Sequence, residues 1–369
     1  MPLLHVFNPS HDEALAANTP YYTPTAAARR LAADLDTLPT VWAAPDDCVW
    51  LADGSALTAN GQRRQLADAV AGGLAGVAPW GWDAHIAKRL HDAGVPATLL
   101  PSQSALAIIR QLSSRATAVG LLADVRADAG EQTVGRSRWC VTATDVAQAM
   151  ADFGPQVVVK APWSCSGRGV FRVGPDDAVK AWPRIGKLLD RQGAVEVEPF
   201  YHGVRDCAME FTAGADGSVT YDGLSVFTTS PAGGYSGNIV AAEPLLRTAL
   251  PQSLHTVLDT VRTSLSKRLE TLLAGRYAGP LGVDMMVIRR ASGELALHPC
   301  IEVNLRRTMG HVALSLRRRL AAPGDAAFFT LAPNTDGHLA IQLAPVRITD
   351  GDIHFSKQGS GTVPNTQIQ

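Results

Sequence analysis

The chain has 369 residues, of which 46% are hydrophobic and 18% are charged, and 33 basic against 34 acidic side chains leave a formal net charge of −1. This balance argues against nucleic acid or an anionic membrane as a partner, and no apolar run approaches the roughly 18 residues of a membrane span. The five cysteines are scattered and contain no Cys-x-x-Cys pair. We therefore expect a cytoplasmic protein of two or three domains that carries no signal segment and has a sizeable core.

The first hundred residues alternate short apolar runs with stretches of helical spacing. The expected strands cover 3–7, 40–44, 76–79 and 95–100, and the expected helices cover 25–35 and 82–93. Strands that alternate with helices indicate a parallel α/β domain.

Three polar residues, Asn8, His11 and Asp12, follow the first expected strand. Loops at the carboxyl ends of such strands are where α/β sheets bind ligands, and a His-Asp pair can orient a substrate or move a proton. The alternative is a helix N-terminus whose dipole is matched by Asp12 and Glu13.

The middle of the chain has an apolar strand that ends in Lys160, a Gly- and Ser-rich loop, and a second strand over 170–173. Glycines let backbone N–H groups approach a phosphate, and Lys and Arg supply charge. The Walker A motif is absent, so the loop is closer to the Gly-rich hairpins that cover nucleotide phosphates in kinases. An ordinary hairpin with a surface lysine is the alternative. Helices are expected over 102–114, 146–153, 176–191 and 254–273.

Two apolar runs, 281–287 and 297–306, predict an antiparallel hairpin with oxygen ligands on it. Glu302 and Asn304 are two residues apart and project from one face, and Asp284 can lie opposite them on the neighbouring strand. Buried carboxylates cost several kcal/mol unless a cation or hydrogen bonds compensate. Such a trio suits a hard cation such as Mg²⁺. The alternative is a pair of edge strands with solvated acids.

Along the chain, the strand lysine with its Gly-rich loop is followed by an acidic strand end, an Asp and a Glu-x-Asn motif. In this order of motifs the chain resembles the ATP-grasp superfamily. That superfamily includes D-alanine–D-alanine ligase, biotin carboxylase and glutathione synthetase. The resemblance covers roughly residues 101–316 and implies an α/β fold with α+β lobes, an ATP-grasp fold preceded by a Rossmann-like domain. The implied division is an N-terminal domain over 1–100, a small lobe with the phosphate loop over 101–200, a metal-binding lobe over 201–357 and a flexible tail over 358–369.

The resemblance also implies the site residues and the cofactors, which are ATP and Mg²⁺, with Mn²⁺ as the alternative cation. The metal is assigned to Asp284, Glu302 and Asn304. Phosphate contacts are assigned to Arg115, Lys160, Ser164, Ser166, Gly167, Arg168 and Gly169. The base and ribose are assigned to Glu196, Val197, Glu198, Tyr201 and Asp206. The reacting substrate is assigned to Arg306, although Leu305-Arg-Arg replaces the Ser/Thr-Pro-Gly turn that peptide-type ligases often show. Asn8 and His11 are assigned to it as well, from their place after the first strand and not from the resemblance.

The implied activity is that of an ATP-dependent ligase that joins a small-molecule carboxylate to an amine through an acylphosphate. A homodimer is compatible with it. A small-molecule kinase and a non-catalytic nucleotide sensor remain as alternatives, whereas an NAD-binding Rossmann protein lacks Gly-x-Gly-x-x-Gly after its first strand. Residues 230–238 are interpreted as a lid over the acceptor substrate or as a long hairpin loop.

Overall fold

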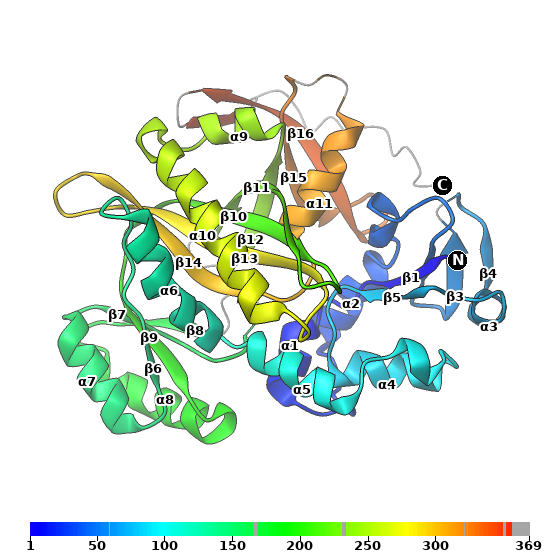
Figure 1. Cartoon of the computed structure of the whole chain (residues 1–369), viewed down its shortest axis with the longest axis horizontal. Coiled ribbons are helices and arrows are strands. Elements are labelled where there is room, and N and C mark those ends of the chain that lie inside the picture. Colours follow the sequence, from blue (N-terminus) through cyan, green and yellow to red (C-terminus); the bar gives the residue numbers. More distant parts are fainter. Residues whose placement is uncertain are drawn as a thin grey trace.

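The computed structural model describes residues 1–58, 60–164, 169–230, 234–320, 322, 324–349 and 352–355. Ser166, Gly167, Arg168 and the tail over 358–369 lie outside the described residues. The described residues form three β-sheets with helices packed around them, so the mixed α/β fold class is confirmed (Figure 1). Within the described ranges, no helix is long and apolar enough to cross a membrane.

The N-terminal sheet has five strands in the order β4-β3-β2-β1-β5. Its strands are β1 (Leu3–Val6), β2 (Cys48–Trp50), β3 (Ser55–Thr58), β4 (Arg63–Gln65) and β5 (Gly76–Pro79), and its helices are α1 (His11–Ala17), α2 (Ala26–Asp34), α3 (Leu66–Ala71) and α4 (Ala84–Asp92). β1 pairs in parallel with both β2 and β5, as the alternation predicts, whereas β3 and β4 add an antiparallel edge.

Two strands expected in this domain are wrong. The segment 40–44 falls on a 3₁₀ helix, η1 (Leu38–Val41), and 95–100 contains another, η2 (Ala97–Leu99). Pro39 and Pro96 explain the difference, because proline fixes φ near the helical value at the start of a turn and has no N–H for a sheet ladder.

A four-stranded sheet of order β6-β9-β7-β8 follows two connecting helices, α5 (Gln103–Leu112) and α6 (Ala116–Ala129). Its elements are β6 (Arg138–Cys140), α7 (Ala143–Phe153), β7 (Val157–Lys160), β8 (Val170–Val173), α8 (Ala178–Gln192) and β9 (Val195–Pro199). The hairpin of β7 and β8 is the one predicted around the Gly-rich loop. Ser102 caps α5, and α7 begins after Thr142 in a capping box with Asp145, three residues before the start expected at 146.

The third sheet has eight strands in the order β14-β13-β10-β11-β12-β15-β16-β17. Its strands are β10 (Gly203–Ala213), β11 (Val219–Thr229), β12 (Tyr235–Val240), β13 (Gly279–Arg289), β14 (Leu295–Asn304), β15 (Ala327–Pro333), β16 (Leu339–Thr349) and β17 (Asp352–Phe355). Its helices are α9 (Glu243–Thr248), η3 (Gln252–Leu254), α10 (His255–Leu273), α11 (Met309–Leu316) and η4 (Arg317–Arg319). Tyr235 and Asn238 of the predicted 230–238 loop belong to β12.

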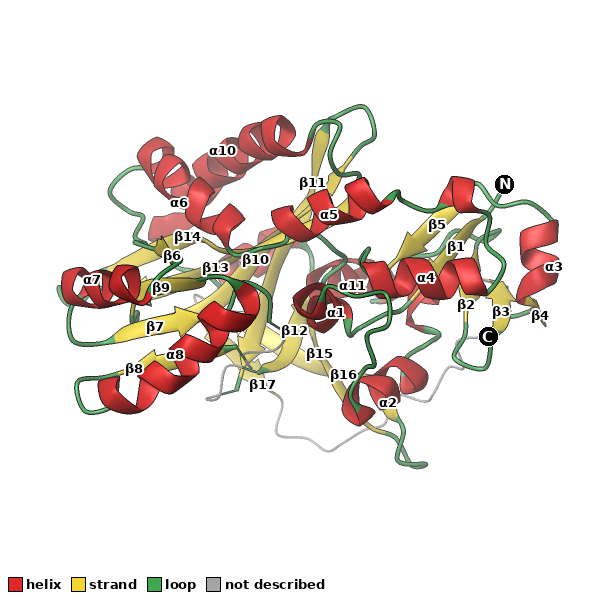
Figure 2. Ribbon diagram, turned by 90° about the horizontal axis from the view of Figure 1, so that it is seen from below, coloured by secondary structure: helices red, strands yellow, loops and turns green. Residues whose placement is uncertain are grey.

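The two faces of this large sheet are covered differently. Alternate residues such as Met209, Val283 and Val303 form the main core with α5, α6 and α10. The opposite face meets α11, whose Val312 and Leu316 pack in a separate cluster with Phe7 and Trp80 of the N-terminal domain. The N-terminal domain is thereby held against the face of the large sheet that α11 covers (Figure 2).

Gly310 in the first turn of α11 lets that helix approach the sheet closely. A Cβ at this position would overlap Glu210 of β10 and lie 2.7 Å from Ser225 Oγ of β11. Gly310→Ala should therefore lower the free energy of unfolding by about 1–3 kcal/mol in denaturant titrations. Gly120→Ala in α6 is the control, because nothing lies within 4 Å of its Cβ and alanine favours a helix by about 1 kcal/mol. Equal stabilities for the two variants would contradict this packing.

Candidate functional site

The three predicted oxygen ligands meet on the β13–β14 hairpin. Asp284 pairs directly with Glu302, and Gly282 pairs with Asn304, so the side chains share the face away from the main core. Asn304 Nδ2 donates a hydrogen bond to Asp284 Oδ2 at 3.1 Å. Burial raises the pKa of Asp284 to about 7, and the charge of Glu302 adds to the rise. The carboxylates are thus close enough to repel each other.

Lys160 at the end of β7 lies between two carboxylates of β9. Its Nζ is 2.9 Å from Glu198 Oε1 and 3.5 Å from Glu196 Oε1, and all three side chains are buried. Burial alone would lower the pKa of Lys160, but the two glutamates outweigh it and raise the pKa. The predicted phosphate-binding lysine is therefore charged and already paired with acids.

Arg115, directly before α6, joins these two groups. Its Nη2 lies 3.0 Å from Glu302 Oε2, while its Nε donates to the carbonyl of Ala161 at 3.1 Å. Ser164 Oγ is 3.5 Å from the same Nη2. The guanidinium thus connects β14 with the loop that follows β7.

The charges of this buried and half-buried cluster do not balance. Lys160 and Arg115 supply two positive charges, and Glu196, Glu198, Asp284 and Glu302 supply four negative ones, which leaves −2 when all are ionised. Buried charge is costly unless it is compensated. A divalent cation beside Asp284 and Glu302 would offset this surplus.

The donor set fits a hard cation that shares its coordination with other ligands. Among the residues that the structure describes, no group of three or more His, Cys, Asp or Glu side chains could hold a metal ion. Two carboxylates and the Asn304 amide are the oxygen donors here. Mg²⁺ is usually held by one or two carboxylates together with water and substrate phosphates, so this set suits Mg²⁺ bound with a phosphate ligand.

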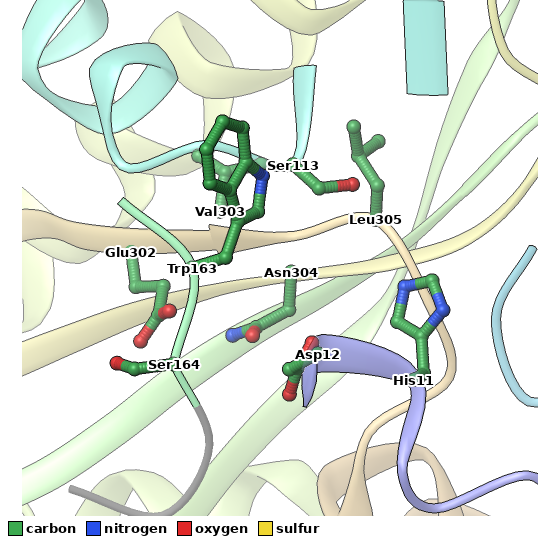
Figure 3. Close-up of a pocket in the computed structure, with 9 residues that line it drawn as sticks. All are labelled: His11, Asp12, Ser113, Trp163, Ser164, Glu302, Val303, Asn304 and Leu305. Carbon is green, nitrogen blue, oxygen red and sulfur yellow. The ribbon is translucent and has the colours of Figure 1, made fainter. Parts of the chain in front are cut away.

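The N-terminal domain reaches the same place through Asp12, which pairs with Arg306. Its guanidinium binds both oxygens of Asp12 at 2.9–3.2 Å, and its Nη2 donates to Asn304 Oδ1 at 2.9 Å. Burial alone would raise the pKa of Asp12, but Arg306 and His11 hold it below its usual value. A small cavity results, lined by His11, Asp12, Ser113, Trp163, Ser164, Glu302, Val303, Asn304 and Leu305 (Figure 3).

His11 and Asn8 differ in their positions. His11 lines this cavity, with Nδ1 3.3 Å from Asp83 Oδ2, and its Nε2 has no hydrogen-bond partner among the described residues. Asn8 does not line the cavity; its Nδ2 donates to Gly81 O at 2.8 Å and to the same Asp83 Oδ2 at 3.2 Å. Asn8 therefore braces the loop that carries His11.

The residues predicted for the base and ribose fall into two places. Tyr201 stands edge-on to His298 at 5.5 Å, and His298 Nε2 is 3.9 Å from Glu198 Oε2, so these three are neighbours of Lys160. Val197 turns its side chain into the core of the small sheet. Asp206 accepts a hydrogen bond from Thr229 Oγ1 at 2.8 Å on the large sheet.

Several buried polar atoms beside Lys160 lack a partner. Glu196 Oε2, Glu198 Oε2 and both ring nitrogens of His298 make no hydrogen bond to any described residue. Burial lowers the pKa of His298 to about 3, so the ring is neutral. Such groups are costly unless they are hydrogen-bonded, and a polar ligand at this position would satisfy them.

Sequence reasoning missed Trp163, Ser113 and His298 as parts of this region. Trp163 carried the clearest signal, because a large apolar residue stands at the start of an otherwise polar loop. Ser113 gave none, since a serine at the end of a helix is common.

No protein-family model and no curated protein sequence matches the chain. The biotin carboxylase domain of 2-oxoglutarate carboxylase from Hydrogenobacter thermophilus, solved with MgADP, ADP and bicarbonate, is similar at a TM-score of 0.48 and 14% identity, over 72% of this chain and 60% of that one. Biotin carboxylase from Campylobacter jejuni is similar at a TM-score of 0.47 and 16% identity, over 76% of this chain and 64% of that one. N5-carboxyaminoimidazole synthetase from Staphylococcus aureus, solved with ADP, is similar at a TM-score of 0.41 and 13% identity, over 61% of this chain and 57% of that one. This chain thus spans between 57% and 64% of the length of these three proteins.

The raised pKa of Asp284 predicts a pH-dependent stability. The folded chain holds this proton up to a pH of about 7, whereas the ordinary value is 3.8. Unfolding therefore becomes easier as the pH rises between these values, and the cost is fully present above 7. With a metal chelator present, so that no cation binds the site, Asp284→Asn should raise the free energy of unfolding by about 2–3 kcal/mol more at pH 8 than at pH 5. The exposed Asp336→Asn is the control, and an equal gain for Asp284→Asn at both pH values would contradict the assignment.

Proposed function

We propose that this chain is an ATP-grasp ligase, which uses ATP and Mg²⁺ to join a small-molecule carboxylate to an amine. The observation that supports the proposal is the single buried cluster in which Arg115 links the oxygen ligands Asp284 and Glu302 to Lys160. A nucleotide binding beside Lys160 would place its phosphates toward Arg115 and the metal-binding hairpin. The orphaned polar atoms of Glu196, Glu198 and His298 would face its base and sugar.

The chemistry needs no nucleophilic side chain. An oxygen of the substrate carboxylate attacks the γ-phosphorus, the bond to the β–γ bridging oxygen breaks, and ADP leaves. The amine then attacks the acyl carbon of the acylphosphate, phosphate departs and the amine loses a proton. When bound, Mg²⁺ neutralises charge on the phosphate oxygens. Arg115 and Lys160 contribute fixed positive charge to the same transition state.

The acceptor end of the site is proposed at the cavity beside Asn304. His11 comes from the N-terminal domain, Leu305 from the segment after β14 and Ser164 from the loop after β7, so three parts of the chain surround one small space. Arg306, next to Leu305, donates to Asn304 of the same lining. Arg306 is a fork-shaped donor that suits a carboxylate, and here it is bound to Asp12. We infer that a substrate carboxylate competes with Asp12 for this guanidinium.

Removal of a metal ligand tests the proposed cofactor. Glu302→Gln should reduce ATP-dependent phosphate release at least 100-fold, because a lost ligand costs several kcal/mol of charge stabilisation. The assay is a screen of carboxylate and amine pairs, and calorimetry should show weaker binding of MgATP. Glu294→Gln, exposed at the turn of the same hairpin, is the control and should behave as wild type. Full activity in a folded Glu302→Gln protein would refute the metal assignment, and phosphate release that needs no amine would favour a kinase.

Substitution of His11 tests where the substrate lies. His11→Ala should lower carboxylate-dependent phosphate release about 10-fold or more and leave the Kd for ATP within about twofold, because His11 lines the acceptor cavity and not the Lys160 cluster. His85→Ala on α4 is the matched control. If ATP affinity fell as much as turnover, His11 would belong to the nucleotide side or to the folding core.

A further inference from the structure

A second, larger cavity lies on the N-terminal side of the site. It has a volume of about 780 Å³ and is bounded by α1, α4, α5 and the segment 97–102. The three helices lie side by side in both views (Figures 1 and 2). Small-molecule sites usually enclose about 300–1,000 Å³, so the groove is large enough for a ligand of its own.

The lining of this groove combines an apolar floor with positive charge. Leu15, Leu100 and Leu106 contribute apolar surface, and the charged or titratable residues of the lining are Lys88, His91 and Arg110, without an acid. Lys88 is already bound to Asp92 at 2.7 Å. Arg110 is therefore the cation of interest.

Arg110 has no carboxylate partner among the described residues. Its Nε donates to Leu15 O at 2.7 Å, and its guanidinium stacks on Trp163 at 3.6 Å from the ring centroid. These contacts fix the plane of the group and engage one donor. The two terminal nitrogens remain for a ligand, and their fork matches the two oxygens of a carboxylate.

The wall that holds Arg110 is shared with the proposed active site. Trp163 donates from Nε1 to Arg110 O at 2.9 Å and also lines the small cavity beside Asn304. Helix α1 likewise begins with His11 and Asp12 at that cavity and presents Ala14 and Leu15 to the groove. A ligand in the groove would therefore touch the elements that position the catalytic side.

We propose that the groove between α1, α4 and α5 is a binding site for a small molecule with an apolar body and one carboxylate, which Arg110 holds by its terminal nitrogens. The ligand's apolar part lies against Leu15, Leu100 and Leu106. This site is separate from the proposed nucleotide and metal site, and it stands whether or not the ligase activity is correct.

Calorimetric titration with octanoate, an eight-carbon carboxylate, tests the proposal on the full chain. Octanoate should bind with one saturable site, and 1-octanol, which lacks the charge, should bind about tenfold more weakly or worse. Arg110→Gln should weaken octanoate binding by a similar factor. Lys187→Gln, at an exposed lysine of α8 that does not line the groove, is the control and should bind octanoate as wild type does.

A second variant fills the groove and leaves Arg110 in place. Ala107 is exposed and lines the cavity, so Ala107→Trp should abolish octanoate binding without touching the Arg110–Trp163 stack. The absence of saturable binding to the wild type would overturn the proposal. Wild-type affinity in Arg110→Gln or Ala107→Trp would overturn it equally.

Discussion

An ion pair between the buried Arg115 and the half-buried Glu302, 3.0 Å apart, joins the two halves of the site. Arg115 stands where α5 gives way to α6, and Glu302 lies on the edge strand of the large sheet. Burial alone would lower the pKa of Arg115, but Glu302, Glu196, Glu198 and Asp284 together raise it. Loss of Glu302 would leave the buried Arg115 guanidinium without this carboxylate partner, which is costly. The pair therefore connects the β13–β14 hairpin with the loop after β7, whose Ala161 carbonyl also accepts from Arg115.

The same pair belongs to a cluster of four acids and two cations. Burial and the nearby charge of Glu302 disfavour ionisation of Asp284, and several polar atoms near Lys160 have no partner among the described residues. A folded chain can tolerate such costs only where the remaining core is well packed. Here the other face of the large sheet supplies that packing with α6 and α10. Stability from one face of a sheet thus supports an unfavourable charge arrangement on the other.

Local sequence patterns predicted much of this arrangement. The two-residue spacing of Glu302 and Asn304, and the turn after β13, were sufficient to place Asp284 opposite Glu302. Lys160 was correctly placed at the end of a strand, because the apolar run before it stops there and a Gly- and Ser-rich loop follows. The strand expected over 40–44 failed because Pro39 favours a helical turn, a local preference that the apolar pattern concealed.

Contacts between distant segments could not be predicted in this way. The bond of Arg306 to Asp12 spans 294 positions, and the pairing of Lys160 with two glutamates depends on how β7 and β9 lie together. Asn8 was assigned to the substrate from its place after the first strand, and in the structure it bonds Gly81 and Asp83, which lie 73 and 75 positions further along the chain. Such partners of a loop side chain have no fixed period in the sequence.

A crystal structure with Mg²⁺ and a non-hydrolysable ATP analogue tests the central claim most directly. We expect a cation within about 2.0–2.1 Å of carboxylate oxygens of Asp284 and Glu302, with the triphosphate beside Lys160 and the Arg115 guanidinium turned toward a phosphate. A nucleotide bound elsewhere, with Arg115 still paired to Glu302 and no cation on the hairpin, would contradict it.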